Sequence, residues 1–304
     1  MSAAESLWPS LVWDEWKDTA DTLHMWTQIV GHTRMALAAP LNHWWHVTLY
    51  VTPRGLTTSS IPYGGETFDV EFDFIDHRLV IRLSSGPVKV LPLRAQSVAA
   101  FYHEYMDALA SLGIKVEIHS IPDEVADPIP FAKDTVHASY DPDAAHRFWR
   151  ILMQSAEIFK QFQTSWLGKT SPVHFFWGSF DLAVTRFSGR RAPERPGADA
   201  VTREAYSHEV ISFGFWPGNG GYGQPAYYAY AAPEPEGLGN AVVRPQGAFY
   251  SNDRKEFFLN YEDVRKASSP SGAILAFMDS TYRAASVNWD NAALERSGPF
   301  PGRK

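Results

Sequence analysis

The stretch HFFWGSFDLAVTRFSGRR, residues 174–191, combines aromatic, acidic and basic side chains more densely than any other part of the chain. Successive side chains of a β-strand point to opposite faces, so a single strand here would separate two sets of residues. One face would be mostly apolar, yet it would begin with His174 and end with Arg186. Leaving a buried polar group without a partner costs about 1–3 kcal/mol. The sequence therefore predicts that this strand forms one wall of a pocket.

The composition is that of a globular protein rich in aromatic side chains. Of the 304 residues, 45% are hydrophobic and 20% are charged, which is ordinary, but 14% are aromatic and 11 are Trp. Large aromatic side chains fill cores and also line ligand pockets. The formal net charge of -7 argues against a nucleic-acid-binding surface, which needs a basic face. We expect the partner to be a small-molecule ligand or substrate.

The chain contains no cysteine, which excludes disulfides, thiolate metal sites and cysteine nucleophiles. Residues 1–16 lack the basic start and apolar centre of a secretory signal, and no apolar run is long enough to span a bilayer. We therefore expect a cytoplasmic protein without a membrane partner.

Residue patterns in the first half predict a helix, an antiparallel sheet and a second helix. A helical pattern covers 14–38, and another covers 97–111, with Ser97 as its N-cap. Alternation between the helices is typical of an antiparallel meander with one buried face. The predicted strands are 43–52, 68–74, 79–83 and 88–93, followed by a further strand at 114–120 after the second helix.

The acidic residues Asp69, Glu71 and Asp73 share the polar face of the predicted strand 68–74. Three carboxylates could mimic a metal site. We expect them instead to pair across strands with Arg78 or Arg82 on the solvated face of the sheet.

His24, Gln28 and His32 form a polar stripe on the first helix, four residues apart. We expect either a solvated row or a row at the edge of the core, and the alternative is that the stripe faces a cavity.

The second half repeats the pattern of the first. An irregular Pro- and Asp-rich stretch, 121–140, is the best linker candidate, and a helix capped by Asp141 follows it. That helix precedes His174 as the first helix precedes His43. We predict an α+β fold, a duplicated helix–antiparallel sheet–helix unit with two sheets related by a pseudo-twofold axis. The expected repeats are 1–120 and 141–304.

The second repeat is longer than the first because of additional residues at about 187–245. This segment holds an inserted hairpin and loops, including the Gly-rich turn 218–223, which joins two strand-like runs and is therefore no phosphate cradle. Long loops in compact domains are often functional. We expect the function at this insertion, against the strand that begins at His174.

The histidines suggest acid–base or metal chemistry. His43 and His174 would each begin a strand and point to its apolar face, so the two rings converge if the repeats pack about a twofold axis. A metal site built from His43, His174 and His208 is one hypothesis. Another is that His43 and His174 only donate to backbone carbonyls at strand ends.

Carboxylates and arginines complete the candidate site. Asp181 or Glu209 could orient His174 or act as a second acid–base group, and His208 is a further catalytic candidate. Arg186, Arg190 and Arg191 could bind an anion, because guanidinium groups match carboxylate and phosphate geometry. The alternative is a solvated basic loop. His43 and four aromatic residues are the remaining substrate-binding candidates. The aromatic four are Phe175, Trp177, Trp216 and Tyr228.

The strings at 42–64, 171–193 and 205–218 resemble a bacterial family catalogued as a domain of unknown function. The resemblance covers nearly the whole chain and implies no activity.

These residues favour an enzyme of hydrolase or lyase type, acting on a small anionic molecule by His and carboxylate acid–base chemistry. A divalent metal is an open alternative, and no motif for a nucleotide cofactor is present. Two other hypotheses are a non-catalytic protein that binds a small molecule in an aromatic pocket, and an assembly protein with aromatic interfaces.

Overall fold

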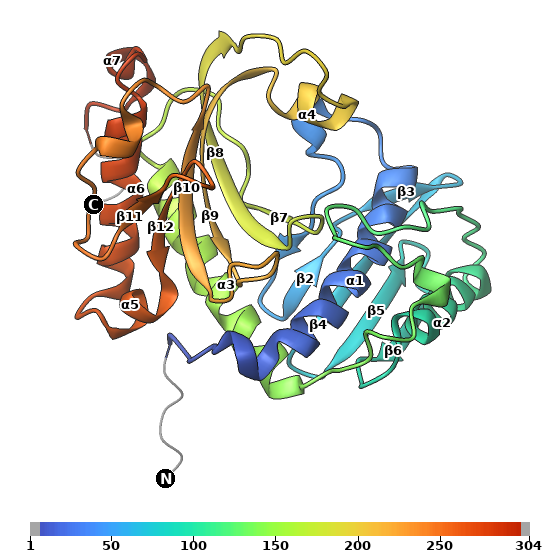
Figure 1. The fold of residues 1–304 in the computed structure, drawn as a ribbon. Helices are drawn as coiled ribbons and strands as arrows, with labels where there is room; N and C mark the ends of the chain where they lie inside the picture. The colour runs from blue at the N-terminus through green and yellow to red at the C-terminus, as the bar shows by residue number, and fades with distance from the viewer. Residues whose placement is uncertain (1–6, 299–304) are drawn as a thin grey trace.

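Two six-stranded antiparallel sheets, flanked by helices, make up the computed structural model, which describes residues 7–298 (Figure 1). The first sheet has the order β1 (Tyr50–Val51), β2 (Gly55–Thr57), β4 (Glu66–Asp73), β5 (Arg78–Leu83) and β6 (Val88–Pro92), and β3 (Ile61–Tyr63) pairs with β4. The second has the order β11 (Phe249–Ser251), β12 (Glu256–Asn260), β10 (Ala226–Ala232), β9 (His208–Trp216), β8 (Asp181–Arg191) and β7 (His174–Phe176). The predicted α+β class is confirmed.

Four longer helices lie beside the sheets: α1 (Trp13–Leu37), α2 (Val98–Ser111), α3 (Pro142–Gln163) and α6 (Pro270–Ala285). Short helical segments fill the connections. These are η1 (Asn42–Trp44), η2 (Phe131–Lys133), α4 (Ala200–Ala205), η3 (Leu238–Asn240), α5 (Tyr261–Lys266) and α7 (Asn291–Leu294). None of the helices within residues 7–298 combines the length and apolar composition that a membrane span requires. Residues 1–6, part of the stretch compared with secretory signals, lie outside the described residues.

Local sequence explains where the helices begin. The Asp141 carboxylate accepts hydrogen bonds from the backbone N–H groups of Asp143 and Ala144, at 2.9 and 3.3 Å. Ser97 does the same for Ala100 at 3.1 Å. These caps satisfy N–H groups that have no partner inside a helix, so both predicted N-caps are confirmed.

The two sheets meet edge to edge. Leu49 and Phe175 exchange two backbone hydrogen bonds of 2.9 and 2.8 Å, which join the edge next to β1 to β7. Trp16 of α1 packs on Phe148 of α3, with ring centroids 5.0 Å apart. Most of the buried hydrophobic residues of both halves therefore form one continuous core.

The cross-strand pairing predicted for the acidic residues of β4 is confirmed, but Glu71 and Asp73 are buried rather than solvated. Asp69 lies 2.8 Å from Arg82, and Asp73 lies 3.2 Å from Arg78. Arg54 adds a second guanidinium to Asp73 at 2.8 Å. These carboxylates are therefore engaged in cross-strand ion pairs.

Three strand predictions are wrong. Residues 43–52 contain a 3₁₀ turn, in which His43 has φ 58, and only Tyr50–Val51 is strand. Residues 114–120 form no strand. The stretch 174–191 is a hairpin rather than one strand, because the chain turns at 177–180 and β8 then pairs with β7. Side chains therefore alternate between the two faces within β7 and within β8, as predicted, but the alternation does not continue across the turn between them.

Both halves contain a long helix, an antiparallel sheet and a later helix, while the pseudo-twofold relation between them stays a prediction. The segment 187–245 contributes β9 and β10, which occupy the centre of the second sheet rather than its rim. The predicted linker 121–140 is irregular, as expected. It packs against the body of the protein, where Phe131 is fully buried.

The polar stripe of α1, formed by His24, Gln28 and His32, is buried, so the expectation of a solvated row is wrong. The His24 Nε2 donates to the Gly178 carbonyl oxygen at 2.8 Å, and His32 contacts Asp123 at 2.9 Å. The stripe fastens α1 to the chain segments that cross it.

Gly31 of α1 lies against the indole of Trp177. A Cβ at this position would fall 2.3 Å from Trp177 Nε1, which donates to the Val47 carbonyl oxygen at 2.7 Å. In an open helix position Gly31→Ala would stabilise by about 1 kcal/mol through helix propensity. Here we expect a net loss of about 1–3 kcal/mol from overpacking, measured by urea unfolding. A variant more stable than the wild type would contradict this packing.

Candidate functional site

The second sheet has one face packed against helices and one face turned away from them. On the packed face Phe213 contacts Phe162 of α3, and the Tyr227 hydroxyl lies 2.8 Å from Ser155 Oγ. Alternation places a different set on the other surface, which we call the cleft face. Its members in the register of β7 to β10 are His174, Phe176, Asp181, Ala183, Thr185, Phe187, Val210, Ser212, Gly214, Trp216, Ala226, Tyr228, Tyr230 and Ala232.

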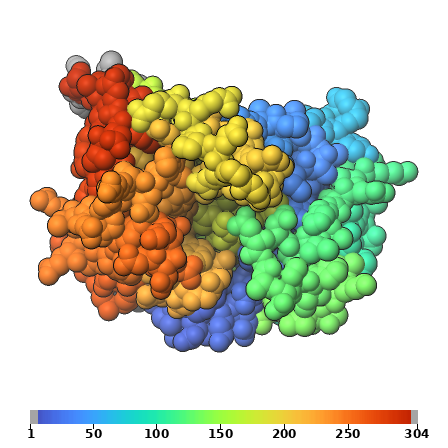
Figure 2. All heavy atoms as spheres, turned by 45° about the horizontal axis from the view of Figure 1, so that its top comes forward, coloured from blue at the N-terminus to red at the C-terminus, as the bar shows by residue number. Residues whose placement is uncertain are grey.

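Figure 2 shows a hollow at the centre of the molecule. Its floor is the yellow-green segment that contains β7 and β8, and its rim includes the segment around α4 (yellow) and the connection between α2 and α3 (green). The hollow therefore opens onto the cleft face, between parts of the chain that are far apart in sequence.

Asp181 and Tyr228 form a buried hydrogen-bonded pair on the cleft face. The Tyr228 hydroxyl donates to Asp181 Oδ2. The two residues are only 6% and 9% exposed. Burial raises the pKa of Asp181 to about 7, against the lowering effect of the Tyr228 hydroxyl, and the charges of Glu124 and Glu256 raise it further. A carboxyl group with this pKa both gives and takes protons at neutral pH.

Gly214 makes the contact between these side chains possible. It lies on β9 between β8 and β10, and a Cβ there would fall 2.3 Å from Tyr228 Cζ. The absence of a side chain lets the Tyr228 ring cross β9 to reach Asp181.

Hydroxyl and carboxyl groups continue along the cleft face. The Tyr206 and Tyr230 hydroxyls lie 2.9 Å apart, and the rings of Tyr228 and Tyr230 stack at 6.1 Å. Burial raises the pKa of Glu256 to about 7. Glu124 reaches the region from the α2–α3 connection, where its Oε2 accepts from Ser179 Oγ at 2.6 Å. Sequence reasoning missed Glu124 and Glu256, because no local pattern indicates which distant carboxylates approach Asp181.

His174 is fully buried beside Tyr50, whose hydroxyl lies 3.4 Å from His174 Nε2. Its Nδ1 makes no hydrogen bond within the described part of the chain. Burial lowers the pKa of His174 to about 3, and the positive charge of Arg34 contributes. The ring is therefore neutral at physiological pH, and such a low pKa makes it a poor general base.

His43 and His208 lie near each other, with ring centroids 5.6 Å apart. Both nitrogens of His43 are engaged, however, since Nδ1 donates to the Ala205 carbonyl oxygen at 3.2 Å and Nε2 accepts from Lys169 Nζ at 2.6 Å. An ammonium group occupies the direction that a metal ion would need. The described residues therefore do not assemble the predicted metal site of His43, His174 and His208.

Sequence reasoning did not select Lys169, which lies beside His43. Its Nζ lies over the rings of Trp45 and Phe187, at 5.2 and 4.7 Å from their centroids. Burial lowers the pKa of Lys169.

The arginines do not form the predicted anion clamp. Arg186 lies on the packed face, where its guanidinium stacks 3.5 Å from the Phe162 ring centroid and donates to the Phe162 carbonyl oxygen at 2.6 Å. Arg190 pairs with Glu209 at 2.7 Å, and Arg191 is exposed near the end of β8. Arg186 and Arg190 therefore do not converge on one ligand.

Glu209 alternates with His208 along β9 and is held by Arg190 and by Ser188 Oγ, which donates to Glu209 at 2.7 Å. The structure shows no contact between Glu209 and His174 among the described residues, so the predicted dyad of these two residues is not assembled. Of the carboxylates chosen from sequence, Asp181 is the one at the cleft.

The predicted aromatic wall is divided. Tyr228 and Trp216 lie on the cleft face, and Trp216 stacks with Tyr222 at 5.4 Å. Phe175 faces the core against Phe148, and Trp177 packs against α1. Phe175 and Trp177 are therefore structural.

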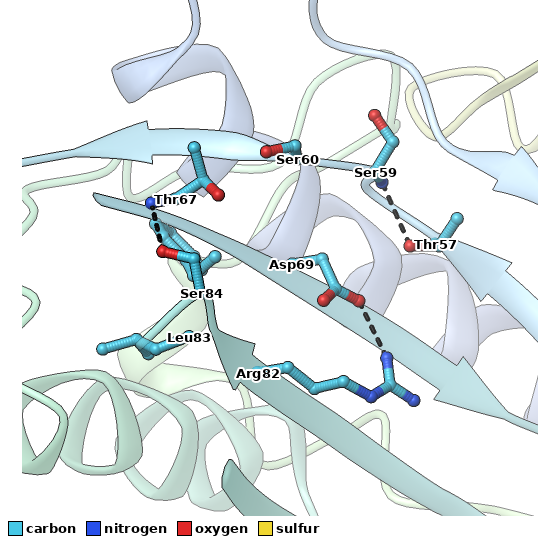
Figure 3. A pocket seen from close by; sticks show the side chains of 9 residues that line it. Thr57, Ser59, Ser60, Thr67, Asp69, Arg82, Leu83 and Ser84 are labelled. Atoms are coloured by element: carbon cyan, nitrogen blue, oxygen red, sulfur yellow. Dashed lines mark hydrogen bonds and ion pairs between the residues drawn. The ribbon is translucent and has the colours of Figure 1, made fainter. Parts of the chain in front are cut away.

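Two of the cavities in the described part of the chain lie away from the cleft face. One of about 310 Å³ sits on the outer surface of the first sheet, lined by hydroxyl side chains and the Asp69–Arg82 pair (Figure 3). The other, of about 50 Å³, contains the Arg190–Glu209 pair. In both, the charged groups already neutralise each other, so neither offers a reactive group comparable to Asp181.

Comparison with known protein families agrees with the resemblance found in the sequence. The family model described as "Family of unknown function (DUF5996)" matches residues 8–296. The chain belongs to the DUF5996 family. No curated protein and no solved structure matches it. Membership of DUF5996 thus confirms the resemblance over nearly the whole chain and assigns no chemistry to Asp181 or Tyr228.

Proposed function

We propose that this DUF5996 protein is an enzyme of hydrolase or lyase type, in which Asp181 transfers protons to and from a small polar molecule bound in the cleft. The observation that supports the proposal is the buried Asp181–Tyr228 pair, in which the carboxyl pKa is about 7. General acid–base catalysis is most effective when the catalytic pKa lies near the working pH. Perturbed carboxyl groups of this kind cluster at functional sites.

Tyr228 would position the carboxyl group and tune its pKa. Its hydroxyl lowers the pKa of Asp181 by donating to the charged form. The stacked Tyr230 and its partner Tyr206 would supply further hydroxyl groups for orienting a bound molecule.

The substrate is proposed to be neutral or cationic at its reacting end. Glu124 and Glu256 act on Asp181 as nearby negative charges, and like charges repel a bound anion. The anionic substrate expected from sequence depended on Arg186, Arg190 and Arg191. Arg186 lies on the packed face, and Arg190 pairs with Glu209. We therefore do not retain the anionic substrate.

The proposal is tested by incubating the purified protein with a panel of neutral and cationic esters, amides and glycosides and measuring turnover. Once a substrate is found, Asp181→Asn should lower kcat by roughly 10²–10⁴-fold without loss of folding. Tyr228→Phe removes a hydrogen bond that lowers the Asp181 pKa, so the pH profile of kcat/KM should move to higher pH. The exposed Asp253→Asn serves as a control and should match the wild type. Full activity of Asp181→Asn would contradict the proposal.

A second candidate is a non-catalytic binding protein with the same cleft. The aromatic surface formed by Trp216, Tyr228 and Tyr230 favours it. Native mass spectrometry of the purified protein distinguishes the two candidates by detecting a retained ligand. If the wild type does not turn this ligand over, and Asp181→Asn binds it as tightly as the wild type does, the protein only binds the ligand.

We also propose a cytoplasmic location. The chain contains no cysteine and so cannot form the disulfides that are typical of proteins in oxidising compartments.

A further inference from the structure

Three potential metal ligands from two distant segments meet beside α1. His32 comes from the helix, and His119 and Asp123 come from the connection between α2 and α3, which crosses α1 (Figure 1). One ligand atom from each side chain lies within 4.8 Å of the others. His32 Nε2 is 2.9 Å from Asp123 Oδ2.

The orientation of the His32 ring suits a metal ligand. Its Nδ1 lies 2.8 Å from the His119 carbonyl oxygen, which only accepts, so Nδ1 carries a proton and Nε2 faces Asp123. Histidine ligands of metals commonly donate their other ring N–H to a carbonyl in this way. The rings of Trp177 and Phe131 pack at 4.8 and 5.5 Å and fix the imidazole.

Asp123 is also held in position. The Gln28 amide donates to the Asp123 carbonyl oxygen at 2.9 Å and accepts from the Asp123 N–H at 2.7 Å. The polar stripe of α1 thus supplies one ligand, His32, and a support, Gln28, for a second.

The separation between the His32 and Asp123 ligand atoms fits one shared ion. Ligands bound at about 2.0–2.2 Å lie roughly 3 Å apart when adjacent, which matches His32 and Asp123. His119 is exposed, so its ring is free to rotate closer. The Asp123 side chain is 45% exposed, which leaves room for solvent or substrate in the remaining coordination positions.

We propose that His32, His119 and Asp123 form a binding site for a divalent transition metal ion of the Zn²⁺ class. Two imidazoles and one carboxylate are a typical donor set for such ions, and the chain offers no thiolate that would compete. The alternative is that His32 and Asp123 form only a hydrogen-bonded pair.

The test is a calorimetric titration of the untagged, chelator-treated full-length protein with Zn²⁺. The absorption spectrum of the protein after addition of Co²⁺ is a second readout. We expect one Zn²⁺ per chain in the wild type. His119→Ala should weaken binding at least roughly tenfold, and because His119 is exposed this variant should fold normally. The exposed His103→Ala is the matched control and should bind as the wild type does.

Two outcomes would overturn the proposal: no stoichiometric binding by the wild type, or equally tight binding by His119→Ala. Either result shows that His32, His119 and Asp123 do not bind the ion together. The readout is metal binding, so it is independent of whether Asp181 is catalytic.

Discussion

Asp181→Asn is expected to raise the free energy of unfolding by up to about 4 kcal/mol at pH 8, with little effect at pH 4. The folded-state pKa of Asp181 is about 7, raised from 3.8 by burial. Between these values the folded protein holds one proton more than the unfolded chain. Its stability therefore falls as pH rises, by about 1.4 kcal/mol per pH unit. Asparagine resembles the protonated acid and does not ionise, so it escapes this loss.

Urea unfolding at several pH values between 4 and 8 measures the effect. Asp253→Asn, at an exposed position, should follow the wild-type curve. If Asp181→Asn and the wild type lose stability in parallel as pH rises, the carboxyl group is ionised throughout and lacks the proposed pKa.

Arg186→Ala is expected to destabilise the protein by about 3–5 kcal/mol. The guanidinium is 2% exposed and lies 3.5, 4.8 and 4.6 Å from the ring centroids of Phe162, Trp166 and Tyr282. Its removal opens a cavity and leaves the Phe162 carbonyl oxygen without this donor. Chemical denaturation measures the loss.

Two further variants separate packing from charge. Arg186→Met fills most of the volume without a charge and should lose less stability than Arg186→Ala. The exposed Arg191→Ala on the same strand should change stability by less than about 0.5 kcal/mol. If Arg186→Ala changes the free energy of unfolding only slightly, the Arg186 side chain does not stabilise the fold and is instead available to bind a ligand.

Helices were predictable because their signals are local. The Asp141 cap followed by Pro142, and the Ser97 cap, mark helix starts within a few residues. The prediction of a strand at 43–52 was wrong because it depended on the aromatic and β-branched composition of this segment. Tertiary contacts determine its backbone conformation, and the composition does not indicate them. The His43 N–H donates to Glu204 at 3.1 Å, a contact across 161 residues that belongs to the 3₁₀ turn and not to a strand.

The site was predictable in part. Asp181 and Tyr228 were both selected from sequence, but as separate candidates, because their contact depends on the register of three strands and on the missing side chain of Gly214. The role of Arg186 was misjudged because one strand was predicted where the chain forms a hairpin. The buried stripe on α1 was misjudged because its partners lie 87 to 154 residues away.

The most direct test of an acid–base group in the cleft is the titration of the Asp181 carboxyl carbon by ¹³C NMR, with Asp181→Asn used to assign the resonance. The structure predicts a midpoint at about pH 7. A midpoint near the ordinary value of 3.8 would show that Asp181 is fully ionised at neutral pH, and it would contradict the proposed role.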